Sequence, residues 1–158
     1  MYAMGTSARH EAAITAAGCE PGLAPDGLPC TTAPMLTSQY TAIVTPASQQ
    51  LATDMAAFTA NERRNLAAAE TALTAEVMSE HAFGTNLAAI KFPVTMAPVA
   101  RALIQANQAR ATLLAEQARS PSLIQLRSFN RRVQVASAAV QTEMKLIAKA
   151  LDAPSPAG

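Results

Sequence analysis

The chain has 158 residues, enough for one domain with its own core, and half of them are hydrophobic although only 4% are aromatic. Its formal net charge is +1, which argues against a strongly basic nucleic-acid-binding protein or an acidic tail. The abundant alanine predicts helices that pack closely along their length. Small-molecule pockets are usually lined by aromatic side chains, and this chain has few of them.

The first part of the chain, residues 1–45, is predicted to be an irregular arm. Residues 1–46 hold five of the ten prolines and four of the six glycines. Within the arm, Cys19 and Cys30 flank ten residues rich in turn formers, a spacing that suits a local disulfide worth about 3 kcal/mol. Two alternatives remain: unlinked thiols, or a lipidated Cys19.

The compartment is inferred from the same arm. A disulfide forms in an oxidising environment, so we expect an extracytoplasmic protein that is secreted, periplasmic or associated with the cell envelope. Arg9, His10 and Glu11 stand where a signal peptide needs apolar residues, so we expect that any signal has already been removed or that the protein is cytosolic. The sequence also lacks an apolar run of about 18 residues, so no transmembrane helix is predicted.

Residues 46–152 are predicted to form an all-α, elongated bundle of three to four helices. Thr45-Pro46 marks a helix start, and Thr59 with Glu62 matches a capping box, which suggests helices over 46–58 and 60–83 or one helix with a joint. Further helices are expected from Pro98 to Arg119 and from Pro121 to Asp152. The remaining residues, 153–158, are expected to be a disordered tail.

Apolar periodicity supports these helices. The predicted helix over 98–119 carries two apolar stripes and is therefore expected to lie between two neighbours, with its tight link to the next helix forming an antiparallel hairpin. The last helix has one continuous apolar stripe with steps of three or four residues: Leu126, Phe129, Val133, Ala136, Val140, Met144, Ile147 and Leu151.

The possible ligand-binding residues are His81 and Glu70, which follow one flank of the apolar stripe of the second predicted helix. An imidazole on an inner face could bind haem or help to bind an apolar ligand. The simpler interpretation is a histidine at the boundary of the core. A di-iron bundle would need paired Glu-x-x-His motifs, and position 78 is methionine, so no metal site is predicted.

Charge is distributed unevenly along the chain. Residues 54–80 carry five acidic and two basic residues, a net charge of −3, whereas residues 91–132 carry seven basic and one acidic residue, a net charge of +6. We expect neighbouring helices to pair these charges, with the arginines either solvated or bridging to Glu70, Glu76 and Glu80.

A second interpretation of the same arginines is a basic surface for an anionic partner. Arg127, Arg131 and Arg132 would form its centre on the last helical hairpin. Nucleic acid is not the expected partner, because binding it would require more positive charge and more stacking aromatics.

Catalytic motifs are missing from the sequence. It contains no nucleophile elbow, glycine-rich phosphate loop or zinc-ligand cluster, so we expect a non-enzymatic protein without a cofactor. The leading hypothesis is a structural or protein-interaction module, an accessory subunit of a larger extracytoplasmic assembly that binds a protein partner or itself. The alternatives are a carrier of an apolar ligand or haem and an anion- or nucleic-acid-binding arginine hairpin.

Overall fold

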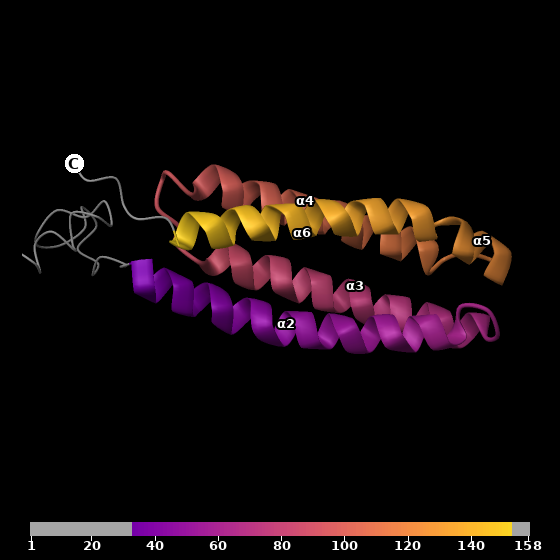
Figure 1. Ribbon diagram of the computed structural model, residues 1–158. Helices are drawn as coiled ribbons and strands as arrows, with labels where there is room; N and C mark the ends of the chain where they lie inside the picture. Colours follow the sequence, from indigo (N-terminus) through magenta and orange to yellow (C-terminus); the bar gives the residue numbers. More distant parts are fainter. Residues whose placement is uncertain (1–32, 153–158) are drawn as a thin grey trace, which may run out of the picture.

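The computed structural model describes residues 33–152, which form an elongated all-α bundle, as predicted (Figure 1). Four long helices run alternately up and down the bundle, and a short helix caps one end between the last two. In chain order they are α2 (Ala33–Asn61), α3 (Leu66–Ala89), α4 (Ala97–Gln117), α5 (Leu123–Ser128) and α6 (Asn130–Asp152).

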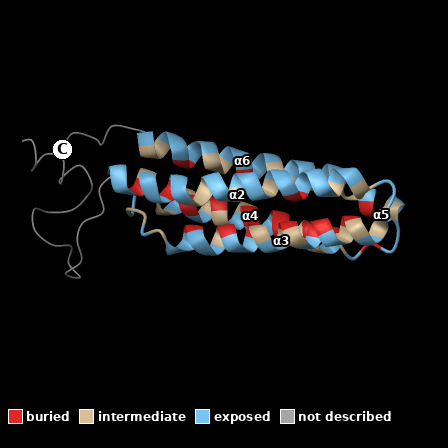
Figure 2. Ribbon diagram, turned by 90° about the horizontal axis from the view of Figure 1, so that it is seen from below, coloured by how far each residue is buried: buried red, intermediate tan, exposed pale blue. Residues whose placement is uncertain are grey.

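Three of the four seams between neighbouring long helices are closed. Helix α2 packs along α3, α3 along α4, and α4 along α6, whereas α2 and α6 touch at few points. Helix α4 therefore lies between two neighbours, and α4 and α6 form the antiparallel hairpin that the sequence predicts. Figure 2 shows the buried residues gathered on the inner faces of α3 and α4, which form the centre of the bundle.

The predicted arm is wrong over residues 33–45, because α2 already begins at Ala33 and continues through Pro46. A proline inside a helix removes one backbone hydrogen bond and costs about 3 kcal/mol in isolation. Leu36 and Tyr40 are both buried, at the spacing of one helical turn. Their burial offsets the cost of the proline, since packing of one face dominates helix stability in proteins.

Helix α2 curves along its length (Figure 1), and Pro46 lies inside it. The missing N–H of Pro46 leaves the carbonyl of Ala42 without its helical donor, and such positions are where helices bend. The predicted cysteine pair, Cys19 and Cys30, and the predicted tail both lie outside the described residues.

The predicted capping box is also wrong. The Thr59 hydroxyl donates to the carbonyl of Met55 within α2, at 2.8 Å, and α2 continues to Asn61. The N-cap of α3 is instead Asn65, whose side chain accepts a hydrogen bond from the amide of Ala68 at 3.1 Å. A threonine or an asparagine at the N-cap can satisfy a free backbone amide of the first helical turn. In α3 this residue is Asn65, which lies nearer to the apolar stripe of the helix than Thr59 does.

The last predicted helix is interrupted near its start. Ser122 caps the short helix α5 by accepting from the amide of Gln125, and α6 then begins at Asn130. The predicted apolar stripe of this region is confirmed, since all eight of its members are buried or half-buried.

Two apolar clusters lie at different heights in the bundle. The cluster that we call the Tyr40 cluster draws its buried residues from all four long helices: Tyr40, Phe83, Leu87, Ala100, Leu103, Val140 and Ile147. The Leu73 cluster is smaller, and its buried residues come only from α3, α4 and α5: Ala69, Leu73, Leu114 and Leu126. Over residues 33–152, none of the helices combines the length and the apolar character needed to cross a membrane.

Candidate ligand-binding groove

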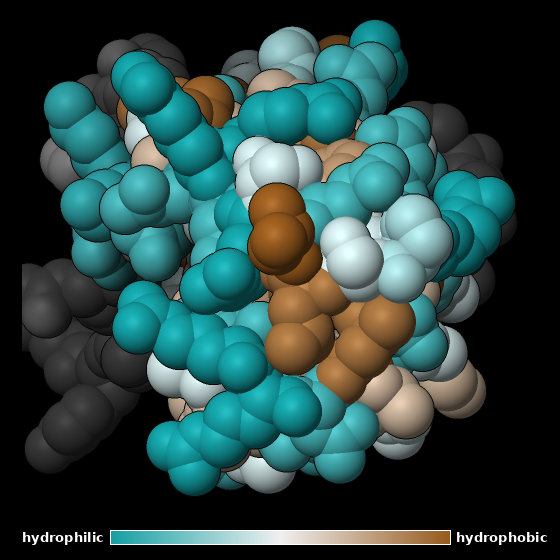
Figure 3. All heavy atoms as spheres, turned by 90° about the vertical axis from the view of Figure 1, so that its right-hand side faces the viewer, coloured by the Kyte–Doolittle hydropathy of each residue, from teal (hydrophilic) through white to brown (hydrophobic). Residues whose placement is uncertain are grey.

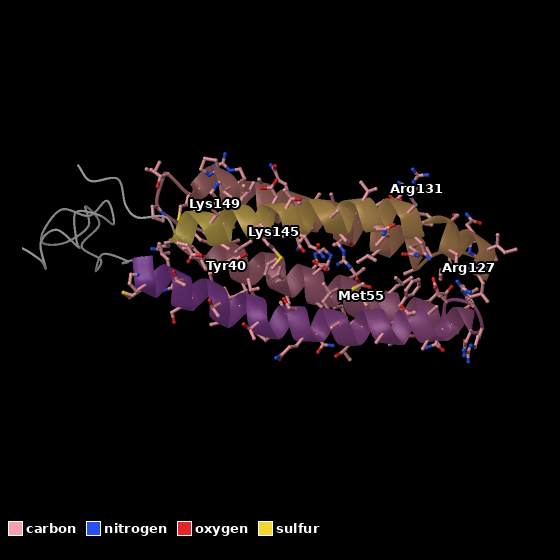
Figure 4. The ribbon with its side chains drawn as sticks, in the orientation of Figure 1. Tyr40, Met55, Arg127, Arg131, Lys145 and Lys149 are labelled. Atoms are coloured by element: carbon pink, nitrogen blue, oxygen red, sulfur yellow. The ribbon has the colours of Figure 1, made fainter. Side chains whose placement is uncertain are left out.

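The open seam between α2 and α6 contains a groove of about 480 Å³. From α2 it is lined by Met55, which is half exposed and lies between the two helices in Figure 4. The groove is lined by a mixture of apolar and polar side chains: Met55, Phe58, Thr59, Glu62, Leu73, Glu76, Arg110, Leu114, Gln117, Asn130, Val133, Gln134, Ser137, Ala138 and Gln141.

A buried guanidinium forms part of the lining of this groove. Arg110 of α4 pairs with two carboxylates of α3, donating from Nη2 to Glu76 and from Nη1 to Glu80, and its Nε donates to the hydroxyl of Ser137 on α6 at 2.7 Å. Glu76 and Glu80 are four residues apart, so they lie on the same face of α3. The prediction that an arginine of the hairpin bridges to these glutamates is confirmed for Arg110, in a buried rather than a solvated setting.

A third carboxylate lies close to this cluster. Asp54 of α2 is buried and accepts hydrogen bonds from the side chains of Gln50 and Ser79, both at 2.9 Å. Both donors are uncharged, so they satisfy the oxygens of Asp54 without neutralising its charge. We call Asp54, Glu76, Glu80 and Arg110 the charged layer.

Burial dominates the acid–base behaviour of the charged layer. It raises the pKa of Glu80 from the ordinary 4.5 to about 7, with repulsion from Glu76 acting in the same direction and attraction to Arg110 opposing both. Burial also raises the pKa of Glu76, and the Asp54 carboxylate adds to this rise while Arg110 opposes it. With all three carboxylates ionised the layer would carry more negative charge than its single guanidinium neutralises, and the raised pKa values reduce that excess by favouring protonation.

A chain of side-chain amides forms one end of the groove. Gln117 of α4 donates from its amide nitrogen to the carbonyl of Leu126 at 2.9 Å and to the side-chain oxygen of Asn130 at 2.8 Å. Asn130 in turn donates to the carboxylate of Glu62, just beyond α2, also at 2.8 Å. These bonds connect α4, α6 and the end of α2 where the two outer helices otherwise barely touch.

A second, smaller hollow of about 40 Å³ lies further along the same seam. Its polar lining includes Glu80 and Asn107, and Asn107 is 1% exposed. The amide nitrogen of Asn107 donates to the backbone carbonyl of Glu80 at 2.7 Å, but its Oδ1 is a buried acceptor without a partner. Gly84 makes room for this amide, because a Cβ there would stand 3.3 Å from the Asn107 nitrogen.

The predicted ligand residues His81 and Glu70 lie apart from the groove. His81 is exposed on α3 rather than on its inner face, and Glu70 is half-buried, while neither lines the groove or the hollow. Eleven residues separate them, about 16 Å along one helix. The structure therefore does not bring them together, because the inner face of α3 is occupied by Leu73, Glu76 and Glu80.

The predicted basic residues lie near the α5 end of the bundle. Arg127, Arg131 and Arg132 are exposed, and Figure 4 shows Arg127 and Arg131 in that region. Arg132 lies 3.8 Å from a carboxylate oxygen of Glu116 and stacks over the ring of Phe129, 5.2 Å from its centroid. Figure 3 looks onto this end and shows a small hydrophobic patch among hydrophilic side chains; Ile124 of α5 is 77% exposed.

Sequence reasoning missed the groove and the unpaired side-chain oxygen of Asn107. The signal for the charged layer was present in the spacing of Glu76 and Glu80 on an otherwise apolar helix face. No such signal marked Asn107, because asparagine is common on helix surfaces.

Two further findings concern metal binding and similarity to known proteins. Within residues 33–152, no group of three or more histidine, cysteine or acidic side chains is arranged to hold a metal ion. No known protein family, curated protein or solved structure matches the chain.

Proposed function

We propose that this protein is a non-enzymatic binding protein that holds a small amphipathic molecule in the groove between α2 and α6. The observation that carries the proposal is the groove itself, an open seam with a buried ion-pair cluster in its wall. Its volume of about 480 Å³ lies within the usual range for small-molecule sites, roughly 300–1,000 Å³.

The lining of the groove supports an amphipathic rather than a purely apolar ligand. Met55, Phe58 and Val133 offer apolar contact, while Gln134 and Gln141 offer amide donors and acceptors. Specific small-molecule sites combine a largely apolar wall with a few polar groups that fix orientation. Haem is a poorer fit, because His81 does not line the groove and Phe58 is the single aromatic residue in its lining.

The test is native mass spectrometry of the protein purified from its own source, with two matched variants. Ala138 on α6 is exposed and lines the groove, whereas its neighbour Ala139 is exposed and does not. We expect a bound small molecule on the unmodified protein and on Ala139→Trp, and its loss from Ala138→Trp, whose indole fills the groove. A bare chain in every preparation, or equal retention by both variants, contradicts the proposal.

Three broader expectations from the sequence stay predictions. They are the role as an accessory subunit of a larger assembly, the extracytoplasmic location, and anion binding by Arg127, Arg131 and Arg132. The same mass measurement tests the first, because stable self-association or a protein partner changes the mass by a whole chain rather than by a small molecule.

A further inference from the structure

The charged layer has more carboxyl groups than cations beside the seam. The layer holds three carboxylates and one guanidinium: Glu76 and Glu80 pair with Arg110, and Asp54 acts electrostatically on Glu76. Each of the three nitrogens of that guanidinium makes one hydrogen bond, to Glu76, Glu80 and Ser137. With every carboxylate ionised, two negative charges are left without a cation, and unpaired buried charge is costly.

The small hollow beside this layer has an unused acceptor. Asn107 is almost completely buried, its nitrogen is committed to the carbonyl of Glu80, and its Oδ1 has no partner. A buried acceptor left unpaired costs about 1–3 kcal/mol. Glu80 and Asn107 both line the hollow, so a donor placed there would face a carboxylate and an amide oxygen together.

The size of the hollow suits one ammonium group. About 40 Å³ is enough for a group the size of a water molecule and too small for a ring or a branched chain. Its remaining wall is largely apolar and includes Leu51, Phe83 and Val140. A protonated amine on an unbranched aliphatic chain matches both the charge and the wall.

The larger groove continues the same seam and offers further carboxylates. The hollow is lined by α2 residues up to Leu51 and the groove from Met55 onwards, one helical turn further along. Glu76, which lines the groove, is likewise about one turn, or 6 Å, from Glu80 along α3. Glu62 lines the groove at its other end.

From these observations we propose that the ligand of the seam is a linear aliphatic diamine or polyamine. One ammonium group lies in the hollow against Glu80 and Asn107 Oδ1, the methylene chain follows the apolar wall of α2 and α6, and a second ammonium group lies near Glu76. This inference rests on the proposed function and names the chemical class of its ligand.

The test is isothermal titration of the full chain with diaminobutane and with spermidine, using butanediol as a neutral analogue. We expect saturable binding of both amines and at least tenfold weaker binding of the diol. Glu80→Gln removes the carboxylate of the hollow with little change of shape, and we expect it to weaken amine binding about tenfold.

Two variants at exposed positions test the inference without changing a buried side chain. Ser48 and Gln49 are both exposed on α2, but only Ser48 lines the hollow. Ser48→Lys places a tethered ammonium group at the hollow, and we expect it to weaken diamine binding about tenfold. Gln49→Lys makes the same charge change one residue away, and we expect less than a twofold effect.

Two outcomes overturn the inference. One is no binding of either amine at millimolar concentration, and the other is binding that Glu80→Gln and Ser48→Lys leave unchanged, which would indicate non-specific attraction to surface carboxylates. If the protein from its own source carries another small molecule that Ala138→Trp removes, the proposed function stands and only the amine assignment fails.

Discussion

The two ends of the α2–α6 seam differ in whether α6 contributes buried side chains to the core between the helices. At the Tyr40 cluster, α6 contributes Val140 and Ile147, and all four long helices meet around buried side chains. Beside the Leu73 cluster, α6 lines an open groove with residues that include Ser137, Ala138 and Gln134, and it contributes none of the buried residues of that cluster. One seam can therefore be closed at one end and open at the other with no break in either helix.

The largest expected effect comes from removing the cation of the charged layer. Arg110→Met leaves Glu76 and Glu80 buried without their partner, and such a loss costs about 3–5 kcal/mol of unfolding free energy. The measurement is urea denaturation at neutral pH. Arg101→Met, an exposed position on the same helix, is the control and should change stability by less than about 0.5 kcal/mol. Equal effects of the two variants would show that the layer is solvated.

Two leucine truncations compare the closed and open ends directly. Leu103 and Leu114 are equally buried on α4, but Leu103 belongs to the Tyr40 cluster whereas Leu114 lines the groove. Truncation of a buried leucine to alanine costs about 2–5 kcal/mol, depending on the cavity that remains. We expect Leu103→Ala near the top of this range and Leu114→Ala near the bottom, because the groove already lies beside Leu114. The reverse order in denaturation experiments would contradict the contrast between the two ends.

The next effect is a dependence of stability on pH. Unfolded Glu80 ionises near the ordinary 4.5, whereas in the folded protein its pKa is about 7. Between these values the folded state binds more protons than the unfolded state, so the free energy of unfolding falls as pH rises from about 4.5 to 7, by roughly 2–3 kcal/mol. Burial is the main cause of this raised pKa, while Arg110 on α4 opposes the rise and Glu76 on α3 adds to it; Asp54 on α2 acts on Glu76.

Glu80→Gln should flatten that dependence, since glutamine carries no titrating proton. Denaturation midpoints measured from pH 5 to 8 for both proteins provide the check. A slope that is the same in both would assign the pH dependence to other groups.

The smallest expected effect lies in the closed end. The hydroxyl of Tyr40 is buried without a hydrogen-bond partner, and burial raises its pKa. Tyr40→Phe removes this unsatisfied group and should raise the free energy of unfolding by about 1 kcal/mol. A loss of stability on thermal denaturation would instead mean that the hydroxyl has a partner, such as a buried water molecule.

The helices were largely predictable because apolar residues at steps of three and four mark the inner face of each helix. The stripe of α6 is such a case, and so are the two faces of α4. The start of α2 was not predictable from local signals, since Pro46 resembles a first-turn proline and only the packing of Leu36 and Tyr40 shows that it is internal.

The groove was harder to predict than the helices. It depends on the distance between α2 and α6, and the α6 side chains that line it differ in length, from Ala138 to Gln134. Helical periodicity identifies which face of a helix points inward but not how far apart two facing helices stand. Charge predicted that arginines of the hairpin are either solvated or bridge to glutamates of the acidic segment, but it did not single out Arg110 or indicate that its pairing with Glu76 and Glu80 is buried.

Pro46 lies within α2 between Tyr40, at the closed end of the seam, and Met55, the first α2 residue that lines the groove. Before it, Tyr40 anchors the helix in its cluster, and after it come the residues that line the groove. The portion from Pro46 to Asn61 is a lever arm about 22 Å long, so a rotation of about 5° at the proline moves its tip by about 2 Å. The hydrogen bond from Asn130 to Glu62 lies beside that tip. It therefore restrains α2 at the point where a rotation at Pro46 would change the width of the groove most.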